Sequence, residues 1–176
     1  MGDRVAVLRR GKLQQVGAPR LVHDQPANKF VAEFIGSPAM NLFPGTVEQL
    51  DGHLVLLGRE TDPHDPSRRF LLPLGSWREK WFGEHLGRSI LLGVRAAAIR
   101  LLSDPAAAQP GDLMEAVVLR SQFTGAQTLC TVTWCHREFN VTAAADVRPT
   151  AGQKVVLRME LTNACVFDAV AGVALF

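Results

Sequence analysis

Cysteine and histidine side chains are the first candidates for chemistry in this 176-residue chain, because they are common metal ligands. The candidates are Cys130, Cys135, His136 and Cys165. Four residues separate Cys130 from Cys135, whereas zinc knuckles keep two residues between their paired cysteines. Strand parity also directs these two side chains to opposite faces. We therefore interpret the cysteines as small buried hydrophobic residues, and we expect no metal site.

Nucleophilic catalysis is a second possibility, since serines occur along the chain and one histidine has acidic neighbours. No serine lies in a G-x-S-x-G elbow; the serines are Ser37, Ser67, Ser76, Ser89, Ser103 and Ser121. His64 lies between Asp62 and Asp65 in a polar loop over 61–67, and no pattern brings it to a serine or a cysteine. Glu60 and Asp62 are typical of turn residues rather than of a general acid and base. We expect no catalytic residues.

Phosphoryl transfer from ATP needs a glycine-rich loop whose backbone N–H groups and lysine hold the phosphates. The chain contains no G-x-x-x-x-G-K-[ST] loop, because Gly11-Lys12 lacks both the upstream glycine and the following Ser or Thr. It also contains no apolar strand that ends in paired acids for magnesium. We therefore expect that the chain does not hydrolyse ATP by itself and holds no cofactor.

Composition indicates an ordinary globular protein with a substantial core: 47% of the residues are hydrophobic and 20% are charged. The net charge of +2 gives no electrostatic case for nucleic acid. Aromatic residues mix with cations only in 77–88, where packing explains the pattern as well as nucleic-acid binding does; these residues are Trp77, Trp81 and Phe82 with Arg78, Lys80 and Arg88. No apolar run approaches the roughly 20 residues of a membrane span. An odd count of three cysteines with no regular spacing argues against a disulfide framework and favours a reduced, cytosolic setting.

The elements that would position any site divide at residues 36–41. Apolar residues at spacings of three and four predict a helix over 26–35, with Pro26 in its first turn and Gly36 at its C-terminal cap. Pro38 prevents further helix, so we predict a boundary between a unit over 1–37 and a second unit over 38–176. Two short strands around Arg10-Gly11 precede this helix.

The second unit is predicted to be mainly β. Strand-like runs alternate with Gly, Pro and Asp breaks, and Asp51-Gly52 predicts a hairpin turn between 46–50 and 53–58. Further strands are expected over 69–74, 89–95, 113–122, 127–134, 137–143, 154–161 and 164–167. This spacing favours a small OB-like antiparallel barrel, preceded by a strand–strand–helix remnant of an α/β domain.

The stretch Val31-Ala-Glu-Phe-Ile-Gly-Ser-Pro-Ala-Met-Asn41 resembles a known junction. It is similar to the link between the nucleotide-binding domain and the C-terminal regulatory domain in sugar-importer ABC ATPases of the maltose/glycerol-3-phosphate type. Residues 2–19 resemble the last strands of that ATPase domain. The resemblance implies a stiff hinge made by Gly36, Ser37, Pro38, Met40 and Asn41. We expect Met40 to pack on the barrel and Asn41 to hydrogen-bond backbone across the junction.

Later segments resemble the regulatory, or TOBE-like, domain of the same family. The run 91–100 resembles its Gly-hydrophobic-Arg motif through Gly93 and Arg95, although Ala96 and Ala97 replace the usual Pro and Glu. Gly125 lies in a strand–Gly–strand unit. In the closing Phe-Asp-x-x-x-Gly segment, Phe167 is expected in the core, Asp168 at the start of a turn, and Gly172 within that turn.

The resemblance implies the regulatory and dimerising part of the ATP-binding subunit of a carbohydrate ABC importer. The intact subunit would be an ATPase at the cytoplasmic face of the cell membrane, working with permease subunits, and ATP and magnesium would bind the N-terminal part that precedes Met1. We expect self-association, no nucleic-acid binding and no direct membrane insertion. The alternative is a stand-alone OB-like module that binds a small ligand or single-stranded nucleic acid. The transported substrate lies beyond what this sequence specifies.

Overall fold

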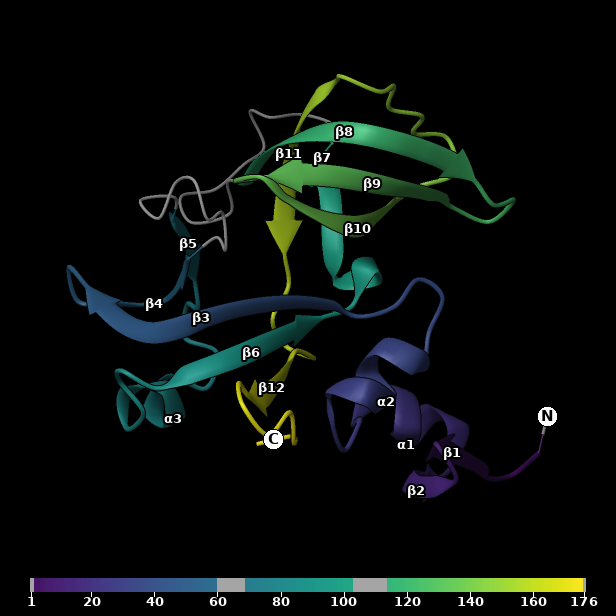
Figure 1. Cartoon of the computed structure of the whole chain (residues 1–176). Coiled ribbons are helices and arrows are strands. Elements are labelled where there is room, and N and C mark those ends of the chain that lie inside the picture. The colour runs from purple at the N-terminus through teal and green to yellow at the C-terminus, as the bar shows by residue number, and fades with distance from the viewer. Residues whose placement is uncertain (1, 60–68, 103–113, 176) are drawn as a thin grey trace.

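The computed structural model describes residues 2–59, 69–102 and 114–175. It begins with a small N-terminal unit, seen at the lower right of Figure 1, in which a β-hairpin precedes two short helices. These elements are β1 (Val5–Arg9), β2 (Lys12–Gly17), α1 (Pro19–Asp24) and α2 (Lys29–Phe34). Val7, Val22 and Val31 form its own small core. The remaining strands build two separate sheets.

The first sheet is open, five-stranded and antiparallel, in the order β12-β6-β3-β4-β5. Its strands are β3 (Asn41–Leu50), β4 (His53–Arg59), β5 (Arg69–Pro73), β6 (Ser89–Val94) and β12 (Cys165–Asp168). The turn between β3 and β4 is at Asp51-Gly52, as predicted, and both residues have positive φ angles, of 50° and 82°. Short helix α3 (Glu79–Gly83) lies beside this sheet in Figure 1.

The second sheet is a closed barrel in the order β10-β7-β11-β8-β9, which Figure 1 shows above the open sheet. Its strands are β7 (Ile99–Leu102), β8 (Met114–Phe123), β9 (Thr128–Trp134), β10 (Arg137–Ala143) and β11 (Lys154–Met159). Three-residue 3₁₀ helix η1 (Ala96–Ala98) leads into β7 from the open sheet. The pairing of β10 with β7 is parallel, and the other pairings in the barrel are antiparallel.

The predicted fold class, mainly β with an OB-like barrel, is confirmed, but the strands do not all enter that barrel. Strand β3 begins at Asn41 rather than at 46, and it pairs with β6 through Asn41↔Val94. The sequence pattern of a strand is weak in this segment, because Pro44 and Gly45 are residue types that are unusual in strands. Gly45 is needed because a Cβ there would lie 2.7 Å from the Leu56 side chain. Strand β3 therefore belongs to an open sheet that is separate from the barrel.

One continuous core joins the open sheet to the barrel. Phe43 of β3 meets Phe139 of β10 in an edge-to-face contact with ring centroids 5.4 Å apart. Phe70 of β5 lies 5.3 Å from Trp134 of β9, measured between ring centroids. Because these contacts cross between the two sheets, the open sheet and the barrel share one packed core.

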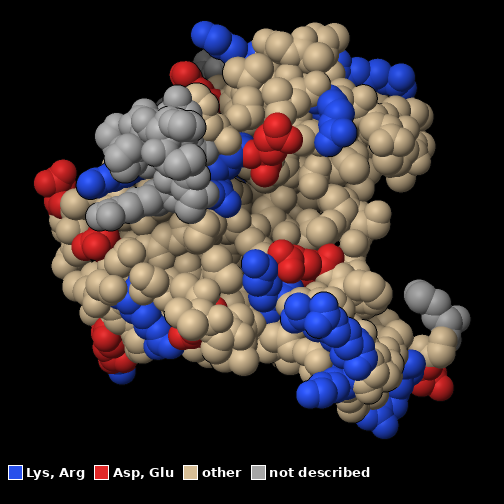
Figure 2. Space-filling model, viewed as in Figure 1, with Lys and Arg blue, Asp and Glu red and all other residues tan. Residues whose placement is uncertain are grey.

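The aromatic segment 77–88 covers this core. Phe82 is fully buried, and Trp77 and Trp81 are partly buried against the core residues. Trp81 also stacks on His85, with ring centroids 4.1 Å apart. Figure 2 shows basic side chains dispersed among acidic ones over the barrel and sheet on the face in view, with a denser basic group over the N-terminal unit. Packing therefore accounts for these aromatic residues.

Candidate functional site at the interdomain junction

Arg95, directly after β6, binds the ends of both N-terminal helices. Its Nη1 donates to the carbonyl oxygens of Ala32 at 3.1 Å and of Ile35 at 2.6 Å, and its Nη2 donates to the carbonyl oxygen of His23 at 2.7 Å. The last carbonyls of a helix lack intrahelical partners and carry partial negative charge, so they suit a guanidinium. One side chain of the open sheet thus closes the C-terminal ends of α1 and α2.

The Arg95 guanidinium is partly withdrawn from water at this contact. Burial lowers the pKa of Arg95 from its ordinary value, and the neighbouring Cys165 and Asp24 oppose that shift. Arginine stays protonated in proteins. The positive charge of Arg95 is therefore compensated by the helix-end carbonyl groups that it binds. Its Nε is buried and makes no hydrogen bond. The contact is therefore sensitive to any change in how the helices approach the sheet.

Gly36 lies against the same guanidinium. Its φ is +128°, a value that side chains rarely adopt, and a Cβ there would lie 2.8 Å from Nη1 of Arg95. The following Ser37–Pro38 peptide is cis. The chain thus turns sharply from α2 toward β3 at the predicted boundary.

The helix that ends at this junction is shorter than predicted. Helix α2 begins after Asn28, whose side chain accepts a hydrogen bond from the Val31 N–H at 3.0 Å, so Pro26 lies outside it. An N-cap asparagine gives the first turn a partner that proline at 26 does not give. Pro19 instead occupies the first turn of α1.

Met40 packs into a small cluster beside the open sheet rather than on the closed barrel. The cluster contains Ala32 of α2 together with Cys165 and Phe167 of β12. Gly93 of β6 makes room for it, because a Cβ at Gly93 would lie 2.5 Å from Met40 Sδ and 2.9 Å from Phe167 Cε2. Phe167 itself is fully buried. Met40 therefore lies between the N-terminal helix and the sheet that carries Arg95.

Asn41 makes a two-way hydrogen bond with the backbone of Asn140 in the barrel. Its Nδ2 donates to the Asn140 carbonyl oxygen at 2.8 Å, and its Oδ1 accepts from the Asn140 N–H at 3.0 Å. The Asn41 residue is 7% exposed, so these groups have little access to water. The start of β3 is thereby fixed against β10 of the barrel.

The C-terminal segment clasps the start of α2. The Lys29 N–H donates to the Gly172 carbonyl oxygen at 2.7 Å, and the Ala174 N–H donates to the Ala27 carbonyl oxygen at 2.9 Å. Gly172 has a φ of +68°. Asp168 organises this turn, because its Oδ1 accepts from two backbone N–H groups, those of Val170 at 3.0 Å and Ala171 at 2.8 Å.

Hydrogen bonds also determine the charge state of Asp168. The backbone N–H of Ala171 is the main cause that lowers the pKa of this carboxyl, and the N–H of Val170 and the Arg88 guanidinium act in the same direction. Nη2 of Arg88 lies 3.3 Å from Oδ2 of Asp168. The carboxylate therefore stays ionised while the turn is formed.

Most of the predicted site residues come together around α2, the start of β3 and the end of β6. Gly125 does not: it lies in the β8–β9 hairpin of the barrel, with a φ of +94°. Ala96 is buried within η1, where the family resemblance implied a proline. The sequence did not predict that Asn41 binds the backbone of Asn140, nor which carbonyl groups Arg95 binds. Backbone partners that are distant in the sequence produce no pattern of side-chain types.

The residues considered for metal binding or catalysis do not form a site in the described part of the chain. Cys130 is buried in the barrel and Cys165 in the open sheet. The interpretation of the cysteines as buried residues is wrong for Cys135, which is exposed because it lies in the β9–β10 turn. Within residues 2–59, 69–102 and 114–175, no three His, Cys, Asp or Glu side chains are placed to hold a metal ion. The acids and histidine of the predicted loop over 61–67, with Glu60, Ser67 and Ser103, lie outside the described residues.

No helix among the described residues has the length and apolar character needed to cross a membrane.

Comparison with known proteins connects this geometry to a family. The family model for the TOBE domain matches residues 92–167, which run from β6 through the barrel to β12. The sn-glycerol-3-phosphate import ATP-binding protein UgpC of Salmonella typhi is 31% identical over 172 residues, which are 98% of this chain and 43% of UgpC. UgpC of Shigella sonnei is 33% identical over 173 residues, with the same coverage. An Escherichia coli O6:H1 protein named "Uncharacterized ABC transporter ATP-binding protein YcjV" is 31% identical over 175 residues, or 99% of this chain and 44% of that protein.

Among solved structures, the cytoplasmic molybdate-binding protein ModG aligns with a TM-score of 0.45 and 13% identity over 72% of this chain and 94% of ModG. That likeness is too distant to bear on function. The chain spans less than half the length of the UgpC and YcjV relatives. Residues 92–167 thus match the TOBE domain, and almost the whole chain is similar to less than half of the ATP-binding proteins UgpC and YcjV.

Proposed function

We propose that this chain is the regulatory and dimerising part of the ATP-binding subunit of a carbohydrate ABC importer. The alignment of 98% of the chain to 43% of UgpC, together with the TOBE match, carries the proposal. In the proposal, ATP and magnesium bind the remaining part of the parent subunit, which couples to permease subunits at the cytoplasmic face of the membrane. In the same proposal, the catalytic groups also belong to that remaining part of the parent subunit.

The junction supplies the mechanical part of this role. A regulatory unit can respond to an opening and closing ATPase domain only if the two are rigidly joined. Arg95 binds α1 and α2, and the 172–174 segment binds the start of α2, so two independent contacts hold the N-terminal unit to the open sheet. Motion of the N-terminal unit is thereby expected to move the sheet, and with it the barrel that shares its core.

Catalysis and oligomeric state of the purified 176-residue protein test this proposal together. We expect no turnover of Mg-ATP, measured as released phosphate, and a concentration-dependent dimer in sedimentation velocity. Turnover that a point substitution within the chain abolishes contradicts the non-catalytic role. Self-association is contradicted if the protein sediments only as a monomer, even at about 100 times the dissociation constant expected for a weak dimer.

The alternative role, a free-standing module for single-stranded nucleic acid, makes a different prediction. Retention on immobilised single-stranded DNA that falls steeply with salt would support it, since phosphate contacts release counterions. Phe82 and its aromatic neighbours pack on the core instead of forming an exposed stacking platform, so we expect no such retention.

A further inference from the structure

The N-terminal unit covers the outer face of the open sheet at one side of that sheet. Met40 and Ala32 pack there against Phe167 of β12. Cross-strand partners share a face, so the same outer face continues through the sheet to the pair formed by Leu57 of β4 and Leu71 of β5. Figure 1 shows β4 and β5 on the side of the sheet away from α2. Leu71 is 49% exposed, so an apolar part of this face reaches solvent beyond the N-terminal unit.

This end of the open sheet carries a pocket of about 760 Å³ between the β3–β4 hairpin, β5 and the segment that leads to α3. Sites for small molecules have volumes of roughly 300–1,000 Å³ and mostly apolar walls. The apolar walls of this pocket are Leu50, Leu54, Val55, Leu71 and Pro73. Leu54 and Val55 are each 8% exposed, whereas Leu50 is 43% exposed. The pocket therefore has a buried apolar floor and an accessible apolar rim.

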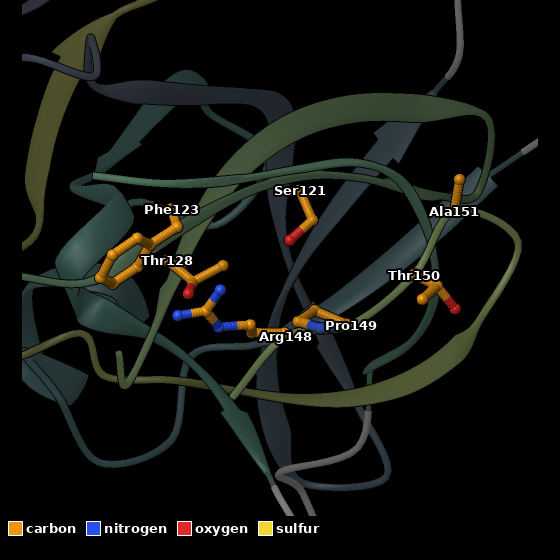
Figure 3. Close-up of a pocket in the computed structure, with 7 residues that line it drawn as sticks. All are labelled: Ser121, Phe123, Thr128, Arg148, Pro149, Thr150 and Ala151. Carbon is orange, nitrogen blue, oxygen red and sulfur yellow. The ribbon is translucent and has the colours of Figure 1, made fainter. Parts of the chain in front are cut away.

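Two carboxylates give the pocket a negative charge. Asp51 and Glu79 line it, and none of its lining residues is lysine or arginine. Neither carboxylate forms an ion pair with another residue in the part of the chain that the structure describes. The pocket of the closed barrel in Figure 3 differs in this respect, because Arg148 is one of the residues that line it. The charge of the open-sheet pocket thus favours a cation.

The backbone fixes the positions from which both carboxylates extend. Asp51 lies in the β3–β4 turn, where its φ is 50°. The Glu79 N–H donates to the Ser76 carbonyl oxygen at 3.3 Å at the start of α3. The Leu74 N–H donates to the Leu54 carbonyl oxygen at 3.0 Å, which attaches the segment before α3 to β4. Because these backbone positions are already set, a ligand orders few additional groups when it binds.

We propose that this pocket binds a small organic ammonium ion with a hydrocarbon body. The hydrocarbon body contacts Leu50, Val55 and Leu71, and the ammonium group donates hydrogen bonds to the carboxylates of Asp51 and Glu79. An exposed ion pair contributes little by itself, so burial of the hydrocarbon body supplies most of the affinity and the carboxylates select the charge. A metal ion does not fit, because no three His, Cys, Asp or Glu side chains among the described residues are placed to hold one. The proposal stands independently of the role assigned to the junction.

Titration of the purified protein, followed by the backbone amide signals in NMR spectra, tests this site. The probes are hexylammonium, hexanol and hexanoate, which share a hydrocarbon chain of one length and differ in charge. At pH 7 and constant ionic strength, we expect hexylammonium to bind about threefold more tightly than hexanol and about tenfold more tightly than hexanoate. The shifted signals should belong to residues 50–55 and 71–79. The proposal is wrong if hexylammonium does not bind, binds no more tightly than either other probe, or shifts signals elsewhere instead.

Two pairs of variants separate the apolar part of the site from the charged part. Leu71→Asn is expected to weaken hexylammonium binding about fivefold, because apolar contact is lost. Leu86→Asn is its control, since Leu86 is 47% exposed and lies outside the pocket.

Glu79→Gln is expected to weaken hexylammonium binding about threefold and to leave hexanol binding unchanged. Glu84→Gln removes an equal charge at the other end of α3, outside the pocket, and serves as the control with unchanged binding. The amide spectra also show whether each variant is folded. If Leu71→Asn or Glu79→Gln binds hexylammonium as tightly as its own control does, the proposed site does not exist.

Discussion

At the scale of single residues, Arg95 makes three hydrogen bonds at the junction. Its fork reaches three carbonyl oxygens in two helices, a geometry that a lysine ammonium cannot reproduce at one position. Gly36 and Gly93 are each required by a close approach, to Arg95 and to Met40 respectively. These residues explain why the motif over 93–95 lies beside the 36–41 segment in space.

Replacement of Arg95 by glutamine is expected to lower the free energy of unfolding by about 3 kcal/mol, because partly buried carbonyls lose charged hydrogen bonds. Arg95→Lys should fall between that variant and the wild type. Arg100→Gln is the matched control: Arg100 and Glu160 form an exposed pair at 3.1 Å, so its loss should cost less than about 1 kcal/mol. Urea unfolding measures all three. Equal losses in Arg95→Gln and Arg100→Gln would show that the helix-end contact is energetically unimportant.

At the scale of elements, the junction depends on how β3 is held at both of its sides. Its first residue pairs with the end of β6, and the Asn41 side chain reaches across to β10. Arg137 at the start of β10 adds a hydrogen bond from Nη2 to the Leu42 carbonyl oxygen at 3.3 Å. The open sheet and the barrel are thus joined by polar contacts as well as by the shared core.

Replacement of Asn41 by alanine leaves the Asn140 N–H and carbonyl oxygen without this partner. We expect a loss of about 2 kcal/mol in unfolding free energy, within the usual cost of unsatisfied buried groups. Gln49→Ala is the control, because Gln49 makes an exposed hydrogen bond of 3.4 Å to the Gly52 carbonyl oxygen. Thermal unfolding of both variants measures the loss of stability that each substitution causes. If the Asn41→Ala protein is as stable as the wild type, the hydrogen bonds of Asn41 do not stabilise the junction.

At the scale of the whole molecule, the N-terminal unit contacts the C-terminal segment. The N-terminal unit docks on the last strand and turn, where Asn28 forms an isolated β-bridge with Val173. Cys165 at the start of β12 lies 3.7 Å from the Asp24 carbonyl oxygen, measured from its Sγ. Attachment of the N-terminal unit therefore depends on the C-terminal turn that Asp168 organises.

This attachment is expected to depend on pH. The folded-state pKa of Asp168 lies below its ordinary value of 3.8, so the carboxylate stabilises the fold above that value, and the contribution is lost as the pH falls through the lowered pKa. Asp168→Asn keeps an oxygen for the backbone N–H groups but does not titrate. The wild type should melt at a higher temperature than Asp168→Asn at pH 7, and the difference should shrink below about pH 4.

Calorimetric melting from pH 7 to pH 3 provides the measurement for this comparison. Asp24 also has a lowered pKa, for which the hydrogen bond with His23 is the main cause, and it titrates in both proteins. Its effect therefore cancels in the difference between the two melting curves. A difference that stays constant over this range would show that the Asp168 charge does not stabilise the turn.

The sequence by itself determined the local elements and the identity of the junction. Alternation along β11 and β9, the Asp51-Gly52 turn, and the residues 31–41 that carry the family resemblance are all local patterns. Within the second unit, β7 and the first half of β3 were missed. Their signals are weak because β7 has four residues and β3 contains Pro44 and Gly45.

Only the tertiary structure decided that the strands divide into an open sheet and a barrel, since that division depends on pairings such as β12 with β6. It also decided the partners of Arg95 and Asn41, which are backbone groups up to 99 residues away. Thr128 and Arg148, which line one pocket of the barrel, are likewise 20 positions apart in the sequence. Backbone atoms are the same at every residue, so a side chain that binds them from afar leaves no trace in the pattern of residue types.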